Sequence, residues 1–312
     1  MLGRGSYGSV FKRDGFAVKK SNGGTFEGLQ AISRELYVLR KNLPFCIPFH
    51  TVKNINDTYF IYLDLADHDL LQPNMPEDTC LQIIQGVYHL HLNNIVHRDL
   101  KPENILVRGN HVFLCDFGLS RFLPCNVTDG TSYIVSRWYR APEIHYNKKK
   151  FLEYTKAMDC WALGCLLYQI KSKKILNKDM TFDFKVEDPL IAGLCTMGSE
   201  ERWTMERCLK HMGKELCEKK IKLPKMEKSL SMRSFHLYKQ FDNKEVFEMT
   251  DYLYARHGYY DEMLMLSILL LRGYHFYSTI KSKLNLNFNM LRNFIKDKDV
   301  FHDIDEFLSL IF

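Results

Sequence analysis

The sequence predicts an α+β protein in which the strands come early and the helices come late. Up to Cys115, short apolar runs rich in β-branched and aromatic residues alternate with turn residues and with two helical stretches. From Asp159 onward the pattern is helical almost throughout. This order indicates a strand-rich part and a helix-rich part that follow each other along the chain.

Five elements are expected in the strand-rich part, each from its own local pattern. An Asp-Gly turn separates two apolar runs near the N-terminus, which predicts a hairpin. Ile32, Leu36 and Leu39 recur at helical spacing, which predicts the first helix. The expected elements are a hairpin over Val10–Val18, a helix over Glu27–Arg40, a strand over Thr58–Leu65, a helix over Asp78–Asn93 and a hairpin over Asn104–Cys115.

The sequence changes character at residues 213–230, where six lysines surround Pro224. We expect a basic connector there, followed by a separate helical segment over residues 231–312. Val246–Ala255 and Met263–His275 are its strongest helical candidates, because both are apolar with interleaved aromatic residues. The predicted divisions of the chain are therefore residues 1–212, 213–230 and 231–312.

The composition excludes several classes of protein. The chain has 312 residues, of which 46% are hydrophobic and 26% charged, and this excludes disorder as the main state. The net charge of +6 suits phosphate ligands, but no block of Lys and Arg is long enough to predict nucleic-acid binding. The longest apolar run, Met263–Leu271, is about half a membrane span, so no membrane association is expected. Nine scattered cysteines without a C-x-x-C pair predict reduced thiols in an intracellular protein.

A glycine loop, Gly3-x-Gly5-x-x-Gly8-x-Val10, opens the chain. Glycines let the backbone approach a phosphate, and backbone N–H groups can then face the anion. Alone, the motif is equally typical of a flexible hairpin. A dinucleotide-binding loop would need a strand before it and a helix after it, whereas this one continues as a strand. The loop therefore depends on its companions for a functional interpretation.

Four further motifs follow the glycine loop in order. They are Ala17-Val18-Lys19 with Glu35 on the next helix, His97-Arg98-Asp99-Leu100-Lys101-Pro102-Glu103-Asn104, Asp116-Phe117-Gly118 and Ala141-Pro142-Glu143. In order and context, the set resembles a eukaryotic-type protein kinase over about Leu2–His211. The resemblance implies a bilobal α+β fold, with a small strand-rich lobe over about residues 1–65 and a large helical lobe over about 66–212.

The resemblance also implies a role for each chemical residue. Lys19, paired with Glu35, would bind the α- and β-phosphates of ATP, and Asp99 would accept the proton of the substrate hydroxyl. Asn104 and Asp116 would bind Mg²⁺, while Lys101 would meet the γ-phosphate, as is typical of serine/threonine kinases. The implied nucleotide-binding residues are Leu2, Gly3, Arg4, Gly5, Ser6, Tyr7, Gly8, Val10, Ala17, Lys19, Glu35, Asp64 and Ala66, with Leu63 at the gatekeeper position.

The segment Thr131–Glu143 resembles the branch of cyclin-dependent and mitogen-activated kinases, because Trp138-Tyr139-Arg140 precedes Ala-Pro-Glu. This implies that phosphorylation at Thr131, together with Tyr133, orders the activation loop. It implies further a proline preference set through Arg140 and a structural ion pair between Arg202 and Glu143. The arginines that would converge on the phosphorylated residue are Arg34, Arg98 and Arg121.

Three features depart from the pattern. Met1 lies almost on the glycine loop, and Lys171–Pro189 stands where this branch carries a helical insert. Both features are similar to reduced kinases of large DNA viruses. Residues 231–312 have a vague likeness to the central helices of a cyclin box, although its charged pair is not evident. The alternative is a helical extension that packs on the large lobe.

We therefore expect a serine/threonine protein kinase that uses ATP and Mg²⁺ on protein substrates. Its expected partners are an upstream kinase or a cyclin-like activator, and its expected location is the cytoplasm or nucleus, of a host cell if the chain is viral. One alternative is a pseudokinase, an ATP-binding regulatory or interaction module, although the four chemical positions are intact. Another is a small-molecule or lipid kinase, which the complete activation segment disfavours.

Overall fold

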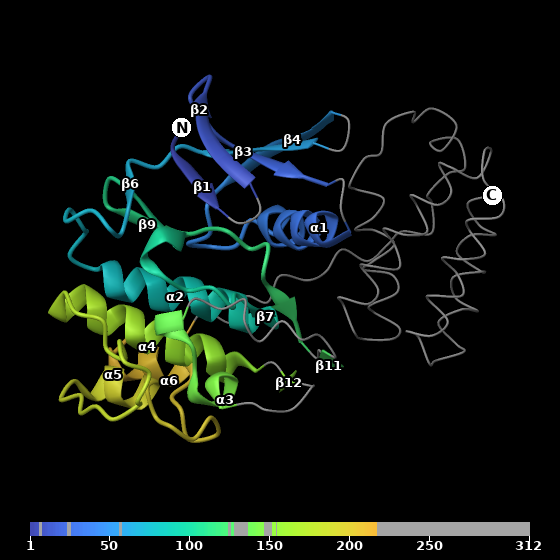
Figure 1. The fold of residues 1–312 in the computed structure, drawn as a ribbon. Helices are drawn as coiled ribbons and strands as arrows, with labels where there is room; N and C mark the ends of the chain where they lie inside the picture. Colours follow the sequence, from blue (N-terminus) through green and yellow to red (C-terminus); the bar gives the residue numbers. More distant parts are fainter. Residues whose placement is uncertain are drawn as a thin grey trace, which may run out of the picture. The chain divides into compact units, whose positions relative to one another are not determined.

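The computed structural model describes residues 1–5, 8–23, 26–55, 58–123, 126–127, 137–146, 152–153 and 155–216. The chain divides into two units, Met1–Ile221 and Lys222–Phe312, and the described residues all belong to the first (Figure 1). The connector predicted at residues 213–230 is described only as far as residue 216. The helical segment predicted at residues 231–312 lies outside the described residues.

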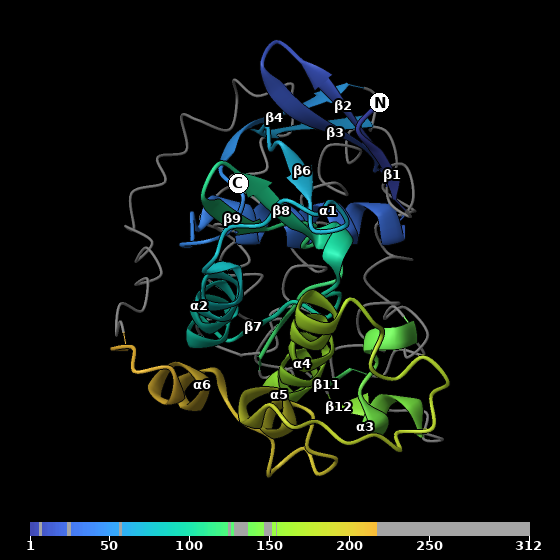
Figure 2. The ribbon, with the colours of Figure 1, turned by 90° about the vertical axis from the view of Figure 1, so that its left-hand side faces the viewer.

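A five-stranded antiparallel sheet forms the N-terminal part of the fold. Its strands run in the order β1-β2-β3-β5-β4, and α1 lies beside the sheet (Figures 1 and 2). The strands are β1 (Gly3–Gly5), β2 (Gly8–Arg13), β3 (Phe16–Asn22), β4 (Phe49–Ile55) and β5 (Thr58–Asp64), and the helix is α1 (Phe26–Arg40). The predicted first hairpin, first helix and strand are therefore confirmed within a few residues.

The turn between β2 and β3 has the conformation that its Asp-Gly pair favours. Asp14 and Gly15 both adopt positive φ, 51° and 84°. Two successive left-handed residues are the mark of a type I′ turn, whose twist matches that of the flanking strands. This turn sets the register of the hairpin, in which Val10 pairs with Lys19.

A second, three-stranded sheet follows, in the order β6-β8-β9. The hairpin predicted over Asn104–Cys115 is confirmed as β8 and β9, and the second predicted helix as α2. Gly86 of α2 lies against Leu114 of β9, where an added Cβ would come within 3.0 Å of that side chain. The elements are β6 (His68–Asp69), α2 (Thr79–Leu92), β7 (Ile95–Val96), the 3-10 turn η1 (Pro102–Asn104), β8 (Ile105–Arg108) and β9 (His111–Leu114).

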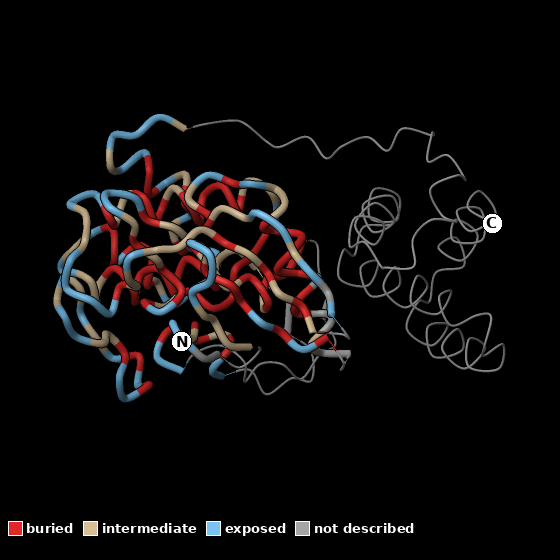
Figure 3. Tube along the Cα trace, turned by 90° about the horizontal axis from the view of Figure 1, so that it is seen from above, coloured by how far each residue is buried: buried red, intermediate tan, exposed pale blue. Residues whose placement is uncertain are grey.

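The remaining elements are short, apart from one helix. The longest helix of this part is α4, and its residues Met158–Leu167 are buried. Figure 3 shows the buried segments of the described residues in red and the exposed segments in pale blue. Two further strand pairs join β10 to β7 and β11 to β12. The elements are β10 (Arg121–Phe122), β11 (Asn126–Val127), the 3-10 turn η3 (Arg137–Tyr139), α3 (Pro142–His145), β12 (Leu152–Glu153), α4 (Lys156–Ser172), α5 (Pro189–Leu194) and α6 (Met205–His211). Among the described residues, no helix has both the length and the apolar character that crossing a membrane requires.

The prediction of helix almost throughout from Asp159 is wrong between α4 and α5. Residues 173–188 contain no helix, and Lys173, Met180 and Phe182 adopt positive φ, which a helix cannot contain. The buried Asn177 side chain accepts a hydrogen bond from the N–H of Phe182 at 3.0 Å. Phe182 then packs on Trp161 of α4 at 5.6 Å between ring centroids. Local side-chain bonding and an aromatic contact therefore replace helical structure here.

The packing of α5 on Trp203 can be tested by a substitution at Gly193. A Cβ at this position would lie 2.3 Å from the indole ring of Trp203, which is itself covered by Arg207 and His211. We expect Gly193→Ala to lower the free energy of unfolding by about 1–3 kcal/mol, because the indole ring or the backbone of α5 must shift to make room for the new methyl group. Thermal unfolding would measure this against Gly198→Ala, whose new Cβ meets nothing closer than 3.6 Å. Equal melting temperatures for the two variants would contradict the packing described.

Candidate active site

The glycine loop forms a β-hairpin. Gly3 pairs with Val10 and Gly5 with Gly8, and the chain continues as β2 instead of a helix. This excludes the dinucleotide-binding arrangement, as expected. An added Cβ at Gly8 would lie 2.2 Å from the backbone oxygen of Lys20, so close packing of β2 on β3 itself requires glycine here.

Other predicted nucleotide-binding residues lie around this hairpin. The Leu2 N–H donates to the Val10 carbonyl at 2.7 Å, and Ala17 is buried in β3. Ala17 is directly opposite Leu63 of β5, so both side chains lie on one face of the sheet. Of the remaining residues, Arg4 lies in β1, and Ser6 and Tyr7 lie outside the described residues.

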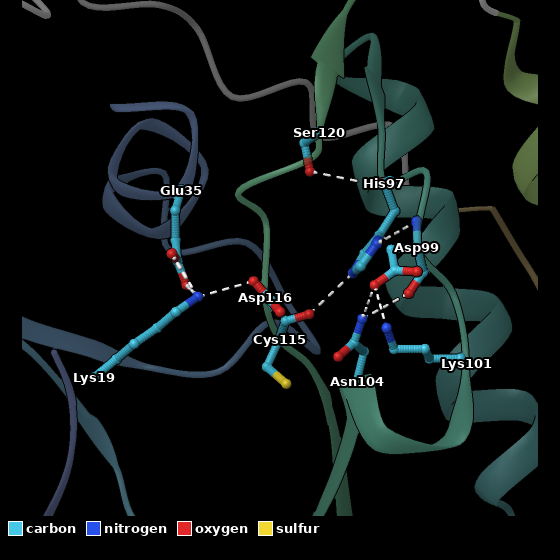
Figure 4. A network of polar contacts seen from close by, with 9 residues as sticks. All are labelled: Lys19, Glu35, His97, Asp99, Lys101, Asn104, Cys115, Asp116 and Ser120. Atoms are coloured by element: carbon cyan, nitrogen blue, oxygen red, sulfur yellow. Dashed lines mark hydrogen bonds and ion pairs between the residues drawn. The ribbon is translucent and has the colours of Figure 1, made fainter. Parts of the chain in front are cut away.

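Lys19 joins the sheet to α1 and to the Asp-Phe-Gly segment (Figure 4). Its Nζ lies 2.7 Å from both carboxylate oxygens of Glu35 and 2.8 Å from Asp116 Oδ1. Burial lowers the pKa of Lys19, but the two carboxylates outweigh burial and raise it well above its ordinary value. For Asp116 the signs are reversed: burial raises its pKa, but the charge and hydrogen bond of Lys19 outweigh burial and lower the pKa below its usual range. The predicted Lys19–Glu35 ion pair is therefore confirmed, with Asp116 as a third member.

Asp99 is held by the two residues predicted to act with it (Figure 4). Lys101 Nζ donates to Asp99 Oδ2 at 2.6 Å, and Asn104 Nδ2 donates to the same oxygen at 2.9 Å. Asn104 Nδ2 also donates to the backbone oxygen of Asp99 at 2.7 Å. The amide nitrogen of Asn104 is thus committed to Asp99, and its side-chain oxygen points away from that residue in Figure 4.

Backbone bonds connect the Asp99 and Asp116 segments. Cys115 donates its N–H to the Asn104 carbonyl at 3.0 Å, and His97 Nε2 donates to the Cys115 carbonyl at 3.1 Å. The His97 ring also contacts Phe117 at 5.2 Å. The structure therefore brings together all the residues predicted to carry chemistry, within one connected polar network (Figure 4).

Sequence reasoning did not assign a role to Asp159, which supports this loop from α4. Its Oδ2 accepts from the His97 N–H at 2.7 Å and from His91 Nε2 at 3.1 Å, while Oδ1 accepts from the Arg98 N–H at 2.8 Å. These bonds hold Arg98 at a φ of 72°. The available signal was a carboxylate inside the apolar run of α4, because a buried charge requires partners.

We expect Asp159→Asn to lower the free energy of unfolding by about 2–4 kcal/mol. An Asn side chain keeps the volume, but its amide nitrogen would face N–H donors and leave at least one of them unpaired. Chemical denaturation of the full chain would measure the change. Asp183→Asn, at an exposed position, is the matched control and should unfold like the wild type.

Asp159 also predicts a dependence of stability on pH. Burial raises its pKa, but the hydrogen bond and charge of His91, with His97 and Arg98, outweigh burial and lower it. A carboxyl whose pKa is lower in the folded state stabilises the protein above its unfolded pKa of about 3.9. This stabilisation is lost as the pH falls through the folded pKa. The stability gap between wild type and Asp159→Asn should therefore narrow below about pH 4, and a constant gap in melting temperature would contradict this.

Three predicted regulatory arginines lie in or just after elements that contact one another. Arg121 of β10 pairs with Val96 of β7, two residues before Arg98. The rings of Tyr37 in α1 and Phe122 in β10 lie 4.5 Å apart, one helical turn from Arg34. All three arginines are buried, whereas Thr131 and Tyr133 lie outside the described residues.

The Arg202–Glu143 ion pair is confirmed as a bidentate contact. Arg202 Nη1 and Nη2 donate to the two carboxylate oxygens at 2.7 and 3.0 Å. The same guanidinium donates to the backbone oxygens of Thr196, Ala157 and Met197. The pair therefore connects α3 to the first turn of α4 and to the loop that follows α5.

The donor set fits Mg²⁺ only together with a phosphate ligand. In the described part of the chain, no cluster of three or more His, Cys, Asp or Glu side chains could hold a metal ion. Mg²⁺ keeps waters and commonly takes one or two protein oxygens plus substrate phosphates. The Asp116 carboxylate and the Asn104 side-chain oxygen are two protein oxygens of this kind. Asp116 also contacts the ammonium group of Lys19, which in turn contacts the carboxylate of Glu35.

Comparison with known proteins agrees with this geometry. Residues 1–219 match the model of the protein kinase domain family. Mitogen-activated protein kinase 4a of Physcomitrium patens is 40% identical over 136 residues, which cover 40% of this chain and 35% of that protein. Mitogen-activated protein kinase 4 of Arabidopsis thaliana is 38% identical over 151 residues, or 45% of this chain and 39% of the relative.

A longer match is to mitogen-activated protein kinase 5 of Oryza sativa subsp. indica, 33% identical over 201 residues, or 56% of this chain and 53% of the relative. The chain thus spans between about a third and about half the length of these relatives. The family match, with the sheet followed by helices, confirms the predicted α+β kinase fold. The likeness to viral kinases stays a prediction.

Proposed function

Because the chain belongs to the protein kinase family, we propose that it transfers the γ-phosphoryl group of ATP to serine and threonine hydroxyls of proteins. One observation carries this proposal. Lys19, Glu35 and Asp116 meet within 2.8 Å, and Asp99 is held by Lys101 and Asn104, in a single network. The charged members of this network have the sign that phosphoryl transfer requires at their positions, and the neutral Asn104 supplies an amide oxygen.

Lys19 binds the α- and β-phosphates in this proposal, and Glu35 holds its ammonium group in place. The raised pKa of Lys19 keeps this group charged throughout the physiological range. Asn104 and Asp116 would hold Mg²⁺, which supplies charge neutralisation for the transferring phosphoryl group. The glycine hairpin β1–β2 and the backbone of Asp64 and Ala66 complete the proposed nucleotide site.

Asp99 accepts the proton of the attacking hydroxyl. Lys101 and Asn104 both donate to its Oδ2, so this oxygen is fixed and Oδ1 faces no donor from these two residues. The arrangement orients the carboxylate before substrate binds, which is the preorganisation that general-base catalysis needs. Lys101, whose Nζ lies 2.6 Å from Asp99 Oδ2, would neutralise negative charge on the γ-phosphate.

The substrate preference proposed is for Ser or Thr followed by Pro. The similarity to relatives named mitogen-activated protein kinases supports it, as does Arg140 directly after η3. We propose further that an upstream kinase phosphorylates Thr131 and Tyr133. Arg34, Arg98 and Arg121 would then bind the phosphate, because their elements already contact one another.

The proposed organisation is a kinase domain over residues 1–212, a connector over 213–230 and a helical segment over 231–312. Reduced thiols support a location in the cytoplasm or nucleus: Cys46, Cys160, Cys165, Cys195 and Cys208 are free and buried.

Phosphate transfer from labelled ATP–Mg²⁺ to a Ser/Thr peptide library tests this function. We expect transfer by the wild type, enriched at Ser/Thr-Pro, and none by Asp116→Asn. Transfer without proline enrichment would retain the kinase and exclude the substrate preference. ATP binding without any transfer, in protein carrying phosphate at Thr131 and Tyr133, would contradict the proposal and favour an ATP-binding regulatory module.

A further inference from the structure

A second ionic network lies behind the proposed adenine site and takes no part in the phosphate-handling contacts. It consists of His50 in β4, Asp64 at the end of β5 and Arg108 at the end of β8. His50 Nε2 lies 2.5 Å from Asp64 Oδ1, and Arg108 Nη1 donates to Asp64 Oδ2. The two partners take opposite oxygens of the carboxylate and come from different sheets.

A β-bulge directs His50 toward Asp64. The pairing of β4 with β5 shifts between Phe49–Leu63 and Thr51–Tyr62, so His50 is the extra residue. A bulge changes the direction in which a side chain points. The ring of Phe16, which pairs with Asp64 from β3, contacts the His50 ring edge-on at 4.7 Å. His50 is therefore placed by both backbone and packing.

The connecting segment after β5 is fastened at its far end as well. Asp67 donates its N–H to the Val107 carbonyl at 2.8 Å, and its carboxylate accepts from the Gly109 N–H at 2.9 Å. Leu65 and Ala66 thus lie between two anchored aspartates. Burial raises the pKa of Asp64, but the hydrogen bonds from His50 and Arg108 outweigh it and lower the pKa, which keeps this anchor ionised.

We propose that His50 and Arg108 are positioning residues for ATP: by holding the Asp64 carboxylate from two sheets, they fix the backbone of residues 64–66 where adenine would bind. This inference rests on the proposed function. The network coexists with the assembled Lys19–Glu35–Asp116 contacts, so it accompanies the arrangement suited to nucleotide binding. The Asp64 side chain faces these partners, and its N–H donates to the Pro48 carbonyl at 3.0 Å, so both the side chain and the backbone of Asp64 are held in place.

The test is the dissociation constant of ATP–Mg²⁺ on the full chain, measured by titration calorimetry. We expect Arg108→Gln to raise it by about three- to tenfold, and His50→Phe, which keeps the ring contact with Phe16, by about two- to fivefold. The effects are moderate because the side chains of His50 and Arg108 are 41% and 42% exposed. Arg108→Lys should restore most of the affinity.

Kinetics separate positioning from a purely structural role. The KM for ATP should rise in Arg108→Gln, while kcat at saturating ATP and the KM for peptide stay at wild-type values. Lys171→Met is the matched control, because it removes a partly exposed ion pair with Asp188 that is not part of the proposed nucleotide site. It should change neither the KM for ATP nor kcat. If Arg108→Gln fails to fold, the ATP dissociation constant and the KM for ATP of His50→Phe test the inference instead.

The outcomes are distinguishable. Unchanged ATP affinity in His50→Phe and Arg108→Gln, with a wild type that binds and transfers, would contradict this inference and leave the proposed function standing. A raised kcat with unchanged affinity would overturn it too, since the network would then restrain motion and not position the nucleotide. A wild type that binds no ATP would contradict both.

Discussion

Asp99→Asn should lower kcat for phosphate transfer by about 10²–10⁴-fold and leave ATP binding within about twofold. The amide cannot accept the proton of the substrate hydroxyl. It can still lie between Lys101 and Asn104, because the substitution preserves shape and the carbonyl oxygen can occupy the position of Oδ2. Steady-state kinetics with a Ser/Thr peptide, paired with an ATP titration, would measure both effects.

Asp69→Asn is the matched control for this prediction. Asp69 lies in β6, where its carboxylate accepts from the backbone N–H of Leu71. Its substitution introduces the same chemical change outside the network, so kcat should stay near the wild-type value. Full activity in Asp99→Asn would contradict the role given to Asp99, and equal loss in both variants would point to a general loss of structure.

Lys19→Met should lower kcat/KM by about 10²-fold, the loss typical of removing one preorganised charged donor. The substitution keeps a long side chain but removes the ammonium group that meets Glu35 and Asp116. The buried carboxylate of Glu35 and the partly exposed carboxylate of Asp116 would then lie near each other without a cation between them. Their mutual repulsion predicts a shift of α1 away from the site and a lower melting temperature as well.

Lys20→Met provides a matched control one residue along the same strand. The side chain of Lys20 is exposed, whereas that of Lys19 is buried. Because successive side chains of a strand point to opposite faces, Lys20 lies on the other face of the sheet. Its loss should leave kcat/KM unchanged, and a comparable loss in the two variants would contradict the assignment of phosphate binding to Lys19.

Sequence patterns within a few neighbouring residues correctly predicted several helices and hairpins. The Asp14-Gly15 turn, the helical spacing of Ile32, Leu36 and Leu39, and the apolar face of α2 each identify an element within a few residues. The edge strand β4 was not predicted separately, because Thr51, Lys53 and Asn54 give it no apolar alternation. This strand forms because it pairs with β5, and the sequence of β4 alone does not show that pairing.

Residues that act through distant partners were harder to predict. Asp159 lies 62 positions from His97, and Asp64 lies 44 positions from Arg108, so their contacts follow from the tertiary fold. Gly8 was assigned to phosphate binding, yet its contact with the Lys20 backbone shows that close strand packing also requires glycine there. Motif reasoning identified the reacting groups, whereas the structure identified what holds them.

The most direct test of phosphoryl transfer measures ATP bound and phosphate transferred in the same sample. Wild type and Asp99→Asn, both phosphorylated at Thr131 and Tyr133, would be compared at saturating ATP–Mg²⁺ with a Ser/Thr peptide. We predict equal ATP binding, and transfer only by the wild type. Equal binding with no transfer by either protein would contradict the account, because the network would then hold ATP without using it.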